Sequence, residues 1–226
     1  MPLPQPKSDE MCRPGFHLVR GHSRVCKTGT KTWVDAHIAK NPLRNGIRIL
    51  LSENLLYLYW TSAKRYKNLK PAKGFKAGED FDAAIQFWLE YWTAEGLDFP
   101  KVDPLLIKCV VAIESGFDPR SQTKVSGSTA KGLMQITATS LSALEGTPNK
   151  DNIRELKNGF VRLIGDDVYD PVMNIAAGTR WLFHKYKLIP RGAKKDIFNT
   201  LKNYYGWTKD GDSYARKVIK LYEQSK

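Results

Sequence analysis

From about residue 44 to the end of the chain, apolar side chains recur every three or four residues, which is the spacing of one face of an α-helix. Segment 80–95 carries the clearest pattern, because six apolar side chains, three of them aromatic, fall on a single helical face. This repeat predicts an all-α fold for most of the chain. We expect its helices at residues 47–66, 80–95, 105–115, 131–144, 151–163, 171–186, 194–204 and 212–223.

The first 43 residues follow a different pattern. Residues 1–14 are polar and contain several prolines, which is typical of a mobile tail. Between residues 16 and 42, β-forming residues stand on both sides of a Lys27-Thr-Gly-Thr turn, and this arrangement predicts a short hairpin. We therefore divide the 226 residues into a basic N-terminal extension, 1–43, and a helical domain, 44–226.

The positive charge of the chain is concentrated near its start. The whole chain has 36 basic and 23 acidic side chains and a net charge of +13. Residues 1–76 hold 15 basic and 4 acidic side chains, a net charge of +11, so the remainder is close to neutral. Such a segment suits an anionic partner, which includes nucleic acid, cell-wall polymer and lipid head groups. A basic binding module without catalysis is one function class that this charge leaves open.

Two features bear on the compartment. No segment reaches the roughly 18 uninterrupted apolar residues of a membrane span, and the N-terminus lacks the apolar core of a secretory signal.

The cysteines are Cys12, Cys26 and Cys109, and they form no disulfide framework. Zinc ligation is a further alternative for the extension, but its thiols and imidazoles match no standard finger spacing, so we expect no metal and no cofactor. The residues of that alternative are Cys12, His17, His22, Cys26 and His37.

Glu114 is the first candidate for catalysis. It follows the very apolar segment 105–113, with Pro104 at the predicted first turn of that helix, and precedes a segment that must leave the helix. A carboxyl group held against apolar side chains loses hydration, which raises its pKa and lets it keep a proton near neutral pH. A general acid needs that property. The alternative is an ordinary solvated glutamate at a helix end.

Three motifs follow one another in order. They are Glu114-Ser-Gly-Phe-Asp-Pro119, Ser126-x-x-x-Ala130-x-Gly132-Leu-Met-Gln135 and Asp170-Pro-x-x-Asn174-Ile-x-x-Gly178-Thr-x-Trp-Leu182. With these motifs the chain resembles, over about residues 102–222, the soluble lytic transglycosylase (SLT) family, peptidoglycan-cleaving enzymes with a goose-type, lysozyme-like helical domain. A fourth segment, with Tyr204, Gly206 and Tyr214, is similar to the family's Tyr-Asn-x-Gly segment and closing helix.

The resemblance implies that Glu114 cleaves the β-1,4 bond between N-acetylmuramic acid and N-acetylglucosamine, acting first as general acid and then as base, with formation of a 1,6-anhydro ring. It implies peptidoglycan glycan strands as substrate and assigns substrate contacts to six other residues. Among these, Tyr204 matches the family tyrosine whose hydroxyl reaches the catalytic glutamate, while Met134 and Gln135 match positions that line the sugar cleft. The six residues are Ser115, Ser126, Met134, Gln135, Asn174 and Tyr204.

The sequence departs from the family pattern at several positions. Thr129 stands in place of a usual Gly, and Ala138 and Ser140 replace the usual Pro and Thr. Tyr205 takes the place of the Asn in Tyr-Asn-x-Gly, so an aromatic contact replaces an amide contact. A hydrolytic muramidase on the same fold is the nearest alternative. An inverting muramidase needs a second carboxylate about 6.5–9.5 Å from the acid, for which Asp118, Glu145 and Asp151 are candidates.

A wall-cleaving enzyme without a signal peptide fits synthesis in the cytoplasm and action on the cell wall after phage lysis or specialised secretion. Residues 1–76 then suit docking on an anionic wall or membrane surface, and we do not expect nucleic acid to be the partner. A delivery or immunity partner also fits this interpretation.

Overall fold

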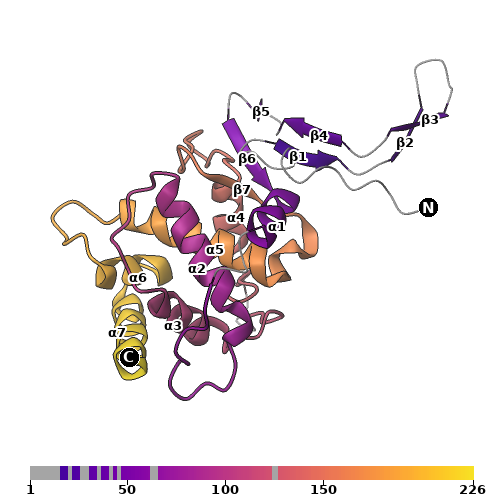
Figure 1. Ribbon diagram of the computed structural model, residues 1–226. Coiled ribbons are helices and arrows are strands. Elements are labelled where there is room, and N and C mark those ends of the chain that lie inside the picture. Colours follow the sequence, from indigo (N-terminus) through magenta and orange to yellow (C-terminus); the bar gives the residue numbers. More distant parts are fainter. Residues whose placement is uncertain are drawn as a thin grey trace.

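The computed structural model describes residues 16–19, 22–25, 31–34, 37–40, 43–44, 47–61, 66–123 and 127–226. Figure 1 shows helices gathered into one body, with a β-ribbon extending from it. The chain is mostly helical, as the apolar repeat predicts, and no helix in the described ranges is long and apolar enough to cross a membrane. The α-helices are α1 (Ser52–Trp60), α2 (Asp82–Ala94), α3 (Pro104–Ser115), α4 (Ala138–Leu144), α5 (Pro171–Lys187), α6 (Ile197–Tyr205) and α7 (Lys209–Ser225).

Helix α3 lies in the middle of the helical body because it is apolar on every side. Residues 105–112 are all buried, including Lys108. The Lys108 ammonium pairs with the buried Asp82 of α2, with Nζ 2.8 Å from Oδ1, and this compensates the charge that burial would otherwise leave unpaired. On its other side α3 packs against α7, while α2 packs against α5. The apolar repeat therefore places α3 in the core with its C-terminal end directed at α7.

The segment predicted as one helix over 47–66 divides into a strand and a helix, so that prediction is wrong at its N-terminal end. Residues Ile47–Leu51 form β6, which pairs antiparallel with β5 (Leu43–Arg44) and parallel with β7 (Phe160–Arg162). Both Ile49 and Leu50 are buried, so successive side chains are covered as in a strand protected on both faces. This segment is a strand because it pairs with residues 111 positions further along the chain, and no local pattern reveals that pairing.

Two further helix predictions need correction. Residues 151–163 form turns and β7 instead of a helix, because the Arg180 guanidinium donates to the carbonyls of Asn158 and Gly159 at 2.7 and 3.0 Å and holds the segment against α5. In 131–144 only α4 is helical. Residues 131–136 form a tight turn closed by two backbone hydrogen bonds between Lys131 and Ile136.

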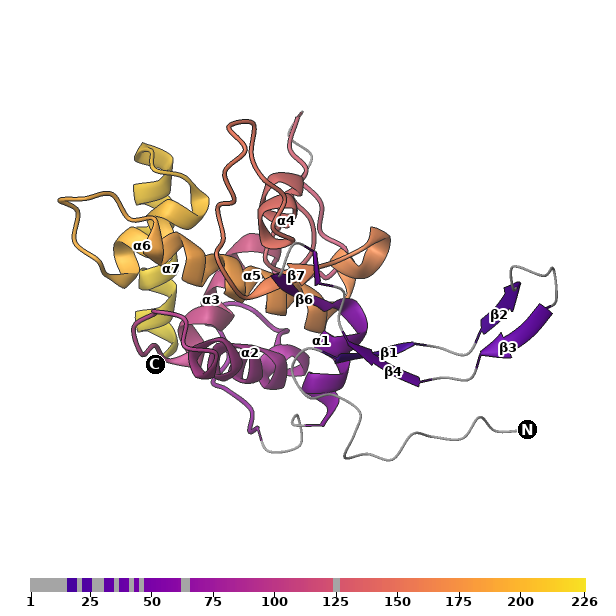
Figure 2. The same cartoon turned by 90° about the horizontal axis from the view of Figure 1, so that it is seen from above.

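The predicted hairpin is present in the N-terminal extension. Strand β1 (Phe16–Val19) pairs antiparallel with β4 (His37–Lys40), and β2 (His22–Val25) pairs antiparallel with β3 (Lys31–Val34). The Lys27-Thr-Gly-Thr turn lies outside the described residues. In the two views of Figures 1 and 2 the β2–β3 end projects away from the helices, at the opposite end of the molecule from α6 and α7. The division of the chain at residue 43 stays a prediction.

Candidate active site

The C-terminal end of α3 delivers Glu114 to the edge of the core. Asp103 caps the start of this helix by accepting from the Leu105 amide, and Pro104 occupies the first turn as expected. At the other end the chain leaves the helix through two residues in the left-handed region, Gly116 at φ 61° and Phe117 at φ 68°. Phe117 is buried, with its ring packed on Phe75 and Phe81. This ending leaves Glu114 in the last helical turn, facing α7.

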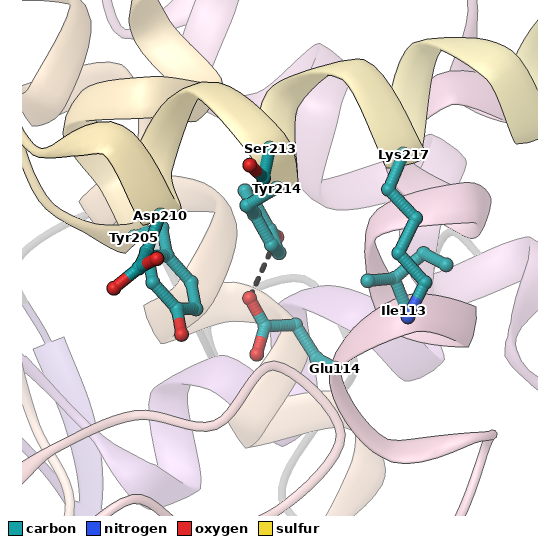
Figure 3. Close-up of a pocket in the computed structure, with 7 residues that line it drawn as sticks. All are labelled: Ile113, Glu114, Tyr205, Asp210, Ser213, Tyr214 and Lys217. Atoms are coloured by element: carbon teal, nitrogen blue, oxygen red, sulfur yellow. Dashed lines mark hydrogen bonds between the residues drawn. The ribbon is translucent and has the colours of Figure 1, made fainter.

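The Glu114 side chain lines a cavity of about 330 Å³ that lies between α3, α6 and α7. Figure 3 shows the glutamate below α7, with Tyr214 directed towards it. Four of the lining residues come from α7 at positions spaced by three and four, which are one face of that helix. The lining residues are Ile113, Glu114, Tyr205, Asp210, Ser213, Tyr214 and Lys217.

The carboxyl of Glu114 has one direct hydrogen-bond partner in this cavity. The Tyr214 hydroxyl donates to Glu114 Oε1 at 2.6 Å. Burial of the carboxyl raises the pKa of Glu114 from its ordinary 4.5 to about 7, while the Tyr214 hydrogen bond and the charge of Lys217 oppose that rise. At neutral pH this carboxyl is therefore present in both its protonated and its ionised form. A group that gives up a proton and later takes one back needs both forms.

Two tyrosines flank the site, the half-buried Tyr204 and the buried Tyr214, and they have different partners. Burial and the nearby Glu114 charge raise the pKa of Tyr204 and of Tyr214 well above the usual value for a phenol, so both hydroxyls remain donors. The hydroxyl of Tyr204 donates to the Met134 carbonyl at 2.7 Å, whereas that of Tyr214 reaches Glu114. The hydrogen bond to the glutamate that the resemblance implies for Tyr204 thus comes from Tyr214, because α7 packs directly along α3.

Met134 and Asn174 hold the 131–136 turn in place, and their side chains are completely buried. Asn174 Oδ1 accepts from the Met134 amide at 2.8 Å, and Nδ2 donates to the carbonyls of Val168 and Lys131 at 2.7 and 3.2 Å. Gly132 gives Asn174 the room it needs, since a Cβ there would overlap the amide. Both side chains are enclosed by protein, and a substrate contact by Met134 or Asn174 stays a prediction.

The remaining predicted contacts are less defined. Ser115 Oγ donates to the Val111 carbonyl at 3.1 Å, and Gln135 Nε2 donates to the carbonyls of Ser121 and Gly132 at 3.2 and 2.9 Å. Both side chains are half-buried. Ser126 lies outside the described residues. Substrate contact by Ser115, Gln135, Ser126 or Tyr204 stays a prediction.

A second cavity continues the first along α7. It measures about 450 Å³ and shares Ile113 and Lys217 with the Glu114 cavity. Its other lining residues include Phe75 and, one helical turn beyond Lys217, Lys220. The two cavities therefore lie next to each other along α7, on either side of Ile113 and Lys217.

The residues that sequence reasoning missed are on α6 and α7. Asp210 and Lys217 line the Glu114 cavity without any signal in the motifs, whereas the sequence marks Tyr205 as a departure from Tyr-Asn-x-Gly and Tyr214 as part of a closing helix. The three- and four-residue spacing of 210, 213, 214 and 217 indicates one face of a helix. Any amphipathic helix shows the same spacing, so the pattern does not tell whether that face lines a cavity or packs on another helix.

The second carboxylates and the metal ligands considered from the sequence lie elsewhere. Asp118 and Asp151 are exposed in loops, and Glu145 pairs with Arg162, so none of the three lines the Glu114 cavity. In the described part of the chain, no three His, Cys, Asp or Glu residues are grouped to hold a metal ion. Cys12 and Cys26 lie outside that part.

Comparison with known proteins supports the same family as the motifs. A family model described as the transglycosylase SLT domain matches residues 91–206, just over half of the 226 residues. Searches of curated proteins and of solved structures gave no significant match. The matched range starts in α2 and ends at Gly206, so it includes Glu114 but not α7. The chain therefore belongs to the transglycosylase SLT family, and its helices form the lysozyme-like domain of that family.

Proposed function

We propose that this protein is a peptidoglycan lytic transglycosylase with Glu114 as its single acid–base group. The observation that carries the proposal is the state of this carboxyl: it lies in a cavity, accepts a hydrogen bond from Tyr214 and has a pKa raised by burial to about 7. A perturbed carboxyl in a cavity is a marker of catalysis, and membership in the SLT family identifies peptidoglycan as the substrate.

The reaction divides into two proton transfers on one residue. Protonated Glu114 donates its proton to the glycosidic oxygen, the bond from C1 of N-acetylmuramic acid to that oxygen breaks, and the N-acetylglucosamine leaves as an alcohol. The Glu114 carboxylate then takes the proton from the C6 hydroxyl while O6 bonds to C1. The 1,6-anhydro ring closes and Glu114 regains its proton, so no water is consumed.

Tyr214 contributes to both steps by donating to the carboxylate and keeping the pKa of Glu114 close to neutral instead of higher. A carboxyl with a much higher pKa would be a weaker acid and would serve poorly in the first step, in which it gives up its proton. A pKa near the working pH suits both steps.

A hydrolytic muramidase is the second candidate, and Asp210 is the observation that favours it. This carboxylate lines the same cavity as Glu114, at the opposite end of the α7 face from Lys217. A water held between two carboxylates is the arrangement of an inverting glycosidase. The two functions predict different products from one substrate.

The test digests purified sacculi and identifies the released fragments by mass spectrometry. Anhydromuramic ends support the transglycosylase, whereas reducing ends support the hydrolase, in which case Asp210→Asn should abolish them. Glu114→Gln should remove all products, and Glu95→Gln, at an exposed glutamate after α2, serves as the matched control. Full activity of Glu114→Gln would refute both functions.

We also propose that the basic residues of the extension dock the enzyme on an anionic wall or membrane surface after phage lysis or specialised secretion. The ribbon projects from the end of the molecule opposite α6 and α7, so docking there leaves the Glu114 cavity accessible. Replacing Arg24 and Lys31 by Gln in the full chain should weaken binding to peptidoglycan in a salt-dependent way. Salt-sensitive binding to DNA with none to wall material would contradict this docking.

A further inference from the structure

A few aromatic side chains in the described part of the chain are exposed, and one of them lines the active-site cavity. Among the residues whose side chains the structure describes, Trp60, Tyr205 and Trp207 are the exposed aromatics. Tyr205 ends α6 and Trp207 lies in the short connection that follows it, and Tyr205, with 57% of its surface accessible, lines the Glu114 cavity. This ring is exposed and lies in the same cavity as the Glu114 carboxyl, so a ligand that reaches the carboxyl also meets the ring.

The backbone between the two helices fixes the position of the Tyr205 ring. Tyr205 is the last residue of α6, and Gly211 brings the first turn of α7 close to it, because a Cβ at Gly211 would overlap the Gly206 carbonyl. The ring of Tyr205 therefore stacks on that of Tyr214, with centroids 5.0 Å apart and planes inclined by 23°. One face of the Tyr205 ring is covered by Tyr214, and the ring remains more than half exposed.

This arrangement links the open ring to the chemistry in two contacts. Tyr205 stacks on Tyr214, and Tyr214 donates to Glu114. A ligand that packs on the accessible part of Tyr205 in this cavity lies beside the acid. Figure 3 shows Tyr205 and Asp210 together on one side of Glu114, with Lys217 on the other.

The chemistry of such a ring selects a particular kind of ligand. In a β-linked pyranose the ring substituents are mostly equatorial, so the C–H bonds of the ring form an apolar face. An aromatic ring offers a flat apolar surface that attracts such C–H groups, while its hydroxyl remains available to a polar group. An amide, which the family resemblance leads one to expect at this position, offers a hydrogen bond but no such surface.

We propose that Tyr205 is a substrate-stacking residue that receives the pyranose ring next to the scissile bond and so positions that bond at Glu114. The inference rests on the proposed function and names the residue that selects the sugar. Because stacking acts on the bound glycan before any bond breaks, Tyr205 contributes to affinity, whereas Glu114 contributes to the chemical step.

The test measures binding in the inactive Glu114→Gln protein, using soluble tetrasaccharides purified from muramidase-digested sacculi and calorimetry. A further Tyr205→Leu change should raise Kd about 3- to 10-fold, as expected for the loss of one aromatic contact. Tyr205→Phe should restore affinity to within about twofold, since it keeps the ring. Trp60→Leu, at an exposed aromatic on α1, should leave Kd unchanged.

A purely structural role for Tyr205 predicts a different result. If the ring only supports Tyr214, Tyr205→Leu in the active protein shifts the pH profile of kcat, and Kd in the Glu114→Gln protein stays the same, which would overturn the proposal. If the Glu114→Gln protein binds no tetrasaccharide and the wild-type protein releases nothing from sacculi, the proposed function fails as well. Loss of affinity with Leu, its recovery with Phe and an unchanged pH profile support stacking.

Discussion

Replacing Glu114 by Gln should stabilise the folded protein at alkaline pH and change its stability much less at pH 4. Burial raises the pKa of Glu114 from 4.5 to about 7, so between these values the folded protein holds a proton that the unfolded chain has lost. Stability contributed by this group is therefore present below pH 4.5 and is lost as the pH rises through 7. Each pH unit corresponds to about 1.4 kcal/mol, and the loss comes to about 3 kcal/mol.

Glutamine does not ionise, so the variant avoids this loss. We expect the free energy of unfolding of Glu114→Gln, minus that of the wild-type protein, to rise by about 3 kcal/mol between pH 4 and pH 8.5 and to level off above pH 8. Urea denaturation followed by tryptophan fluorescence measures both free energies at each pH.

The matched control is Glu95→Gln, because Glu95 is exposed after the end of α2. Its difference from the wild-type protein should vary by less than about 0.5 kcal/mol over the same range, as for most surface substitutions. A Glu114→Gln difference that is flat with pH would refute the reasoning, since it would mean that the carboxyl pays no desolvation cost in the folded state.

Three further changes test other parts of the site. Tyr214→Phe removes the donor to Glu114, so the pKa of Glu114 should rise above about 7. The alkaline limb of the pH profile of kcat/KM should then shift to higher pH by about one unit, and an unchanged profile would contradict this. Asn174→Leu removes the partner of the Met134 amide, a donor to the Val168 carbonyl and one of two donors to the Lys131 carbonyl. The free energy of unfolding should fall by about 2–4 kcal/mol in urea titrations, and a loss below about 1 kcal/mol would show that the turn does not depend on this amide. Gly178→Ala places a Cβ 2.6 Å from Met134 Cβ, so overpacking should lower the free energy of unfolding by about 1–3 kcal/mol and outweigh the gain in helix propensity. A rise in melting temperature would refute that clash.

The sequence predicts α2, α3, α5, α6 and α7 to within a few residues, since each combines a clear apolar repeat with local signals that act within one turn. Asp103 and Pro104 start α3 and Gly116 ends it, and these effects act within one turn of the helix. The same reasoning fails at 47–66 and 151–163. There the outcome depends on β6 pairing with β7 and on Arg180 reaching Asn158 and Gly159.

The sequence by itself also determined that Glu114 stands at the end of an apolar helix and within the motifs of the SLT family. It did not determine which hydroxyl reaches the carboxyl. Tyr214 is 100 residues away along the chain and outside the matched range, and it meets Glu114 because α7 packs along α3. The pKa of Glu114 and the stacked Tyr205 ring likewise depend on that packing. Desolvation, hydrogen bonding and ring contact act through space, and only the tertiary structure decides which groups come within a few ångströms of one another.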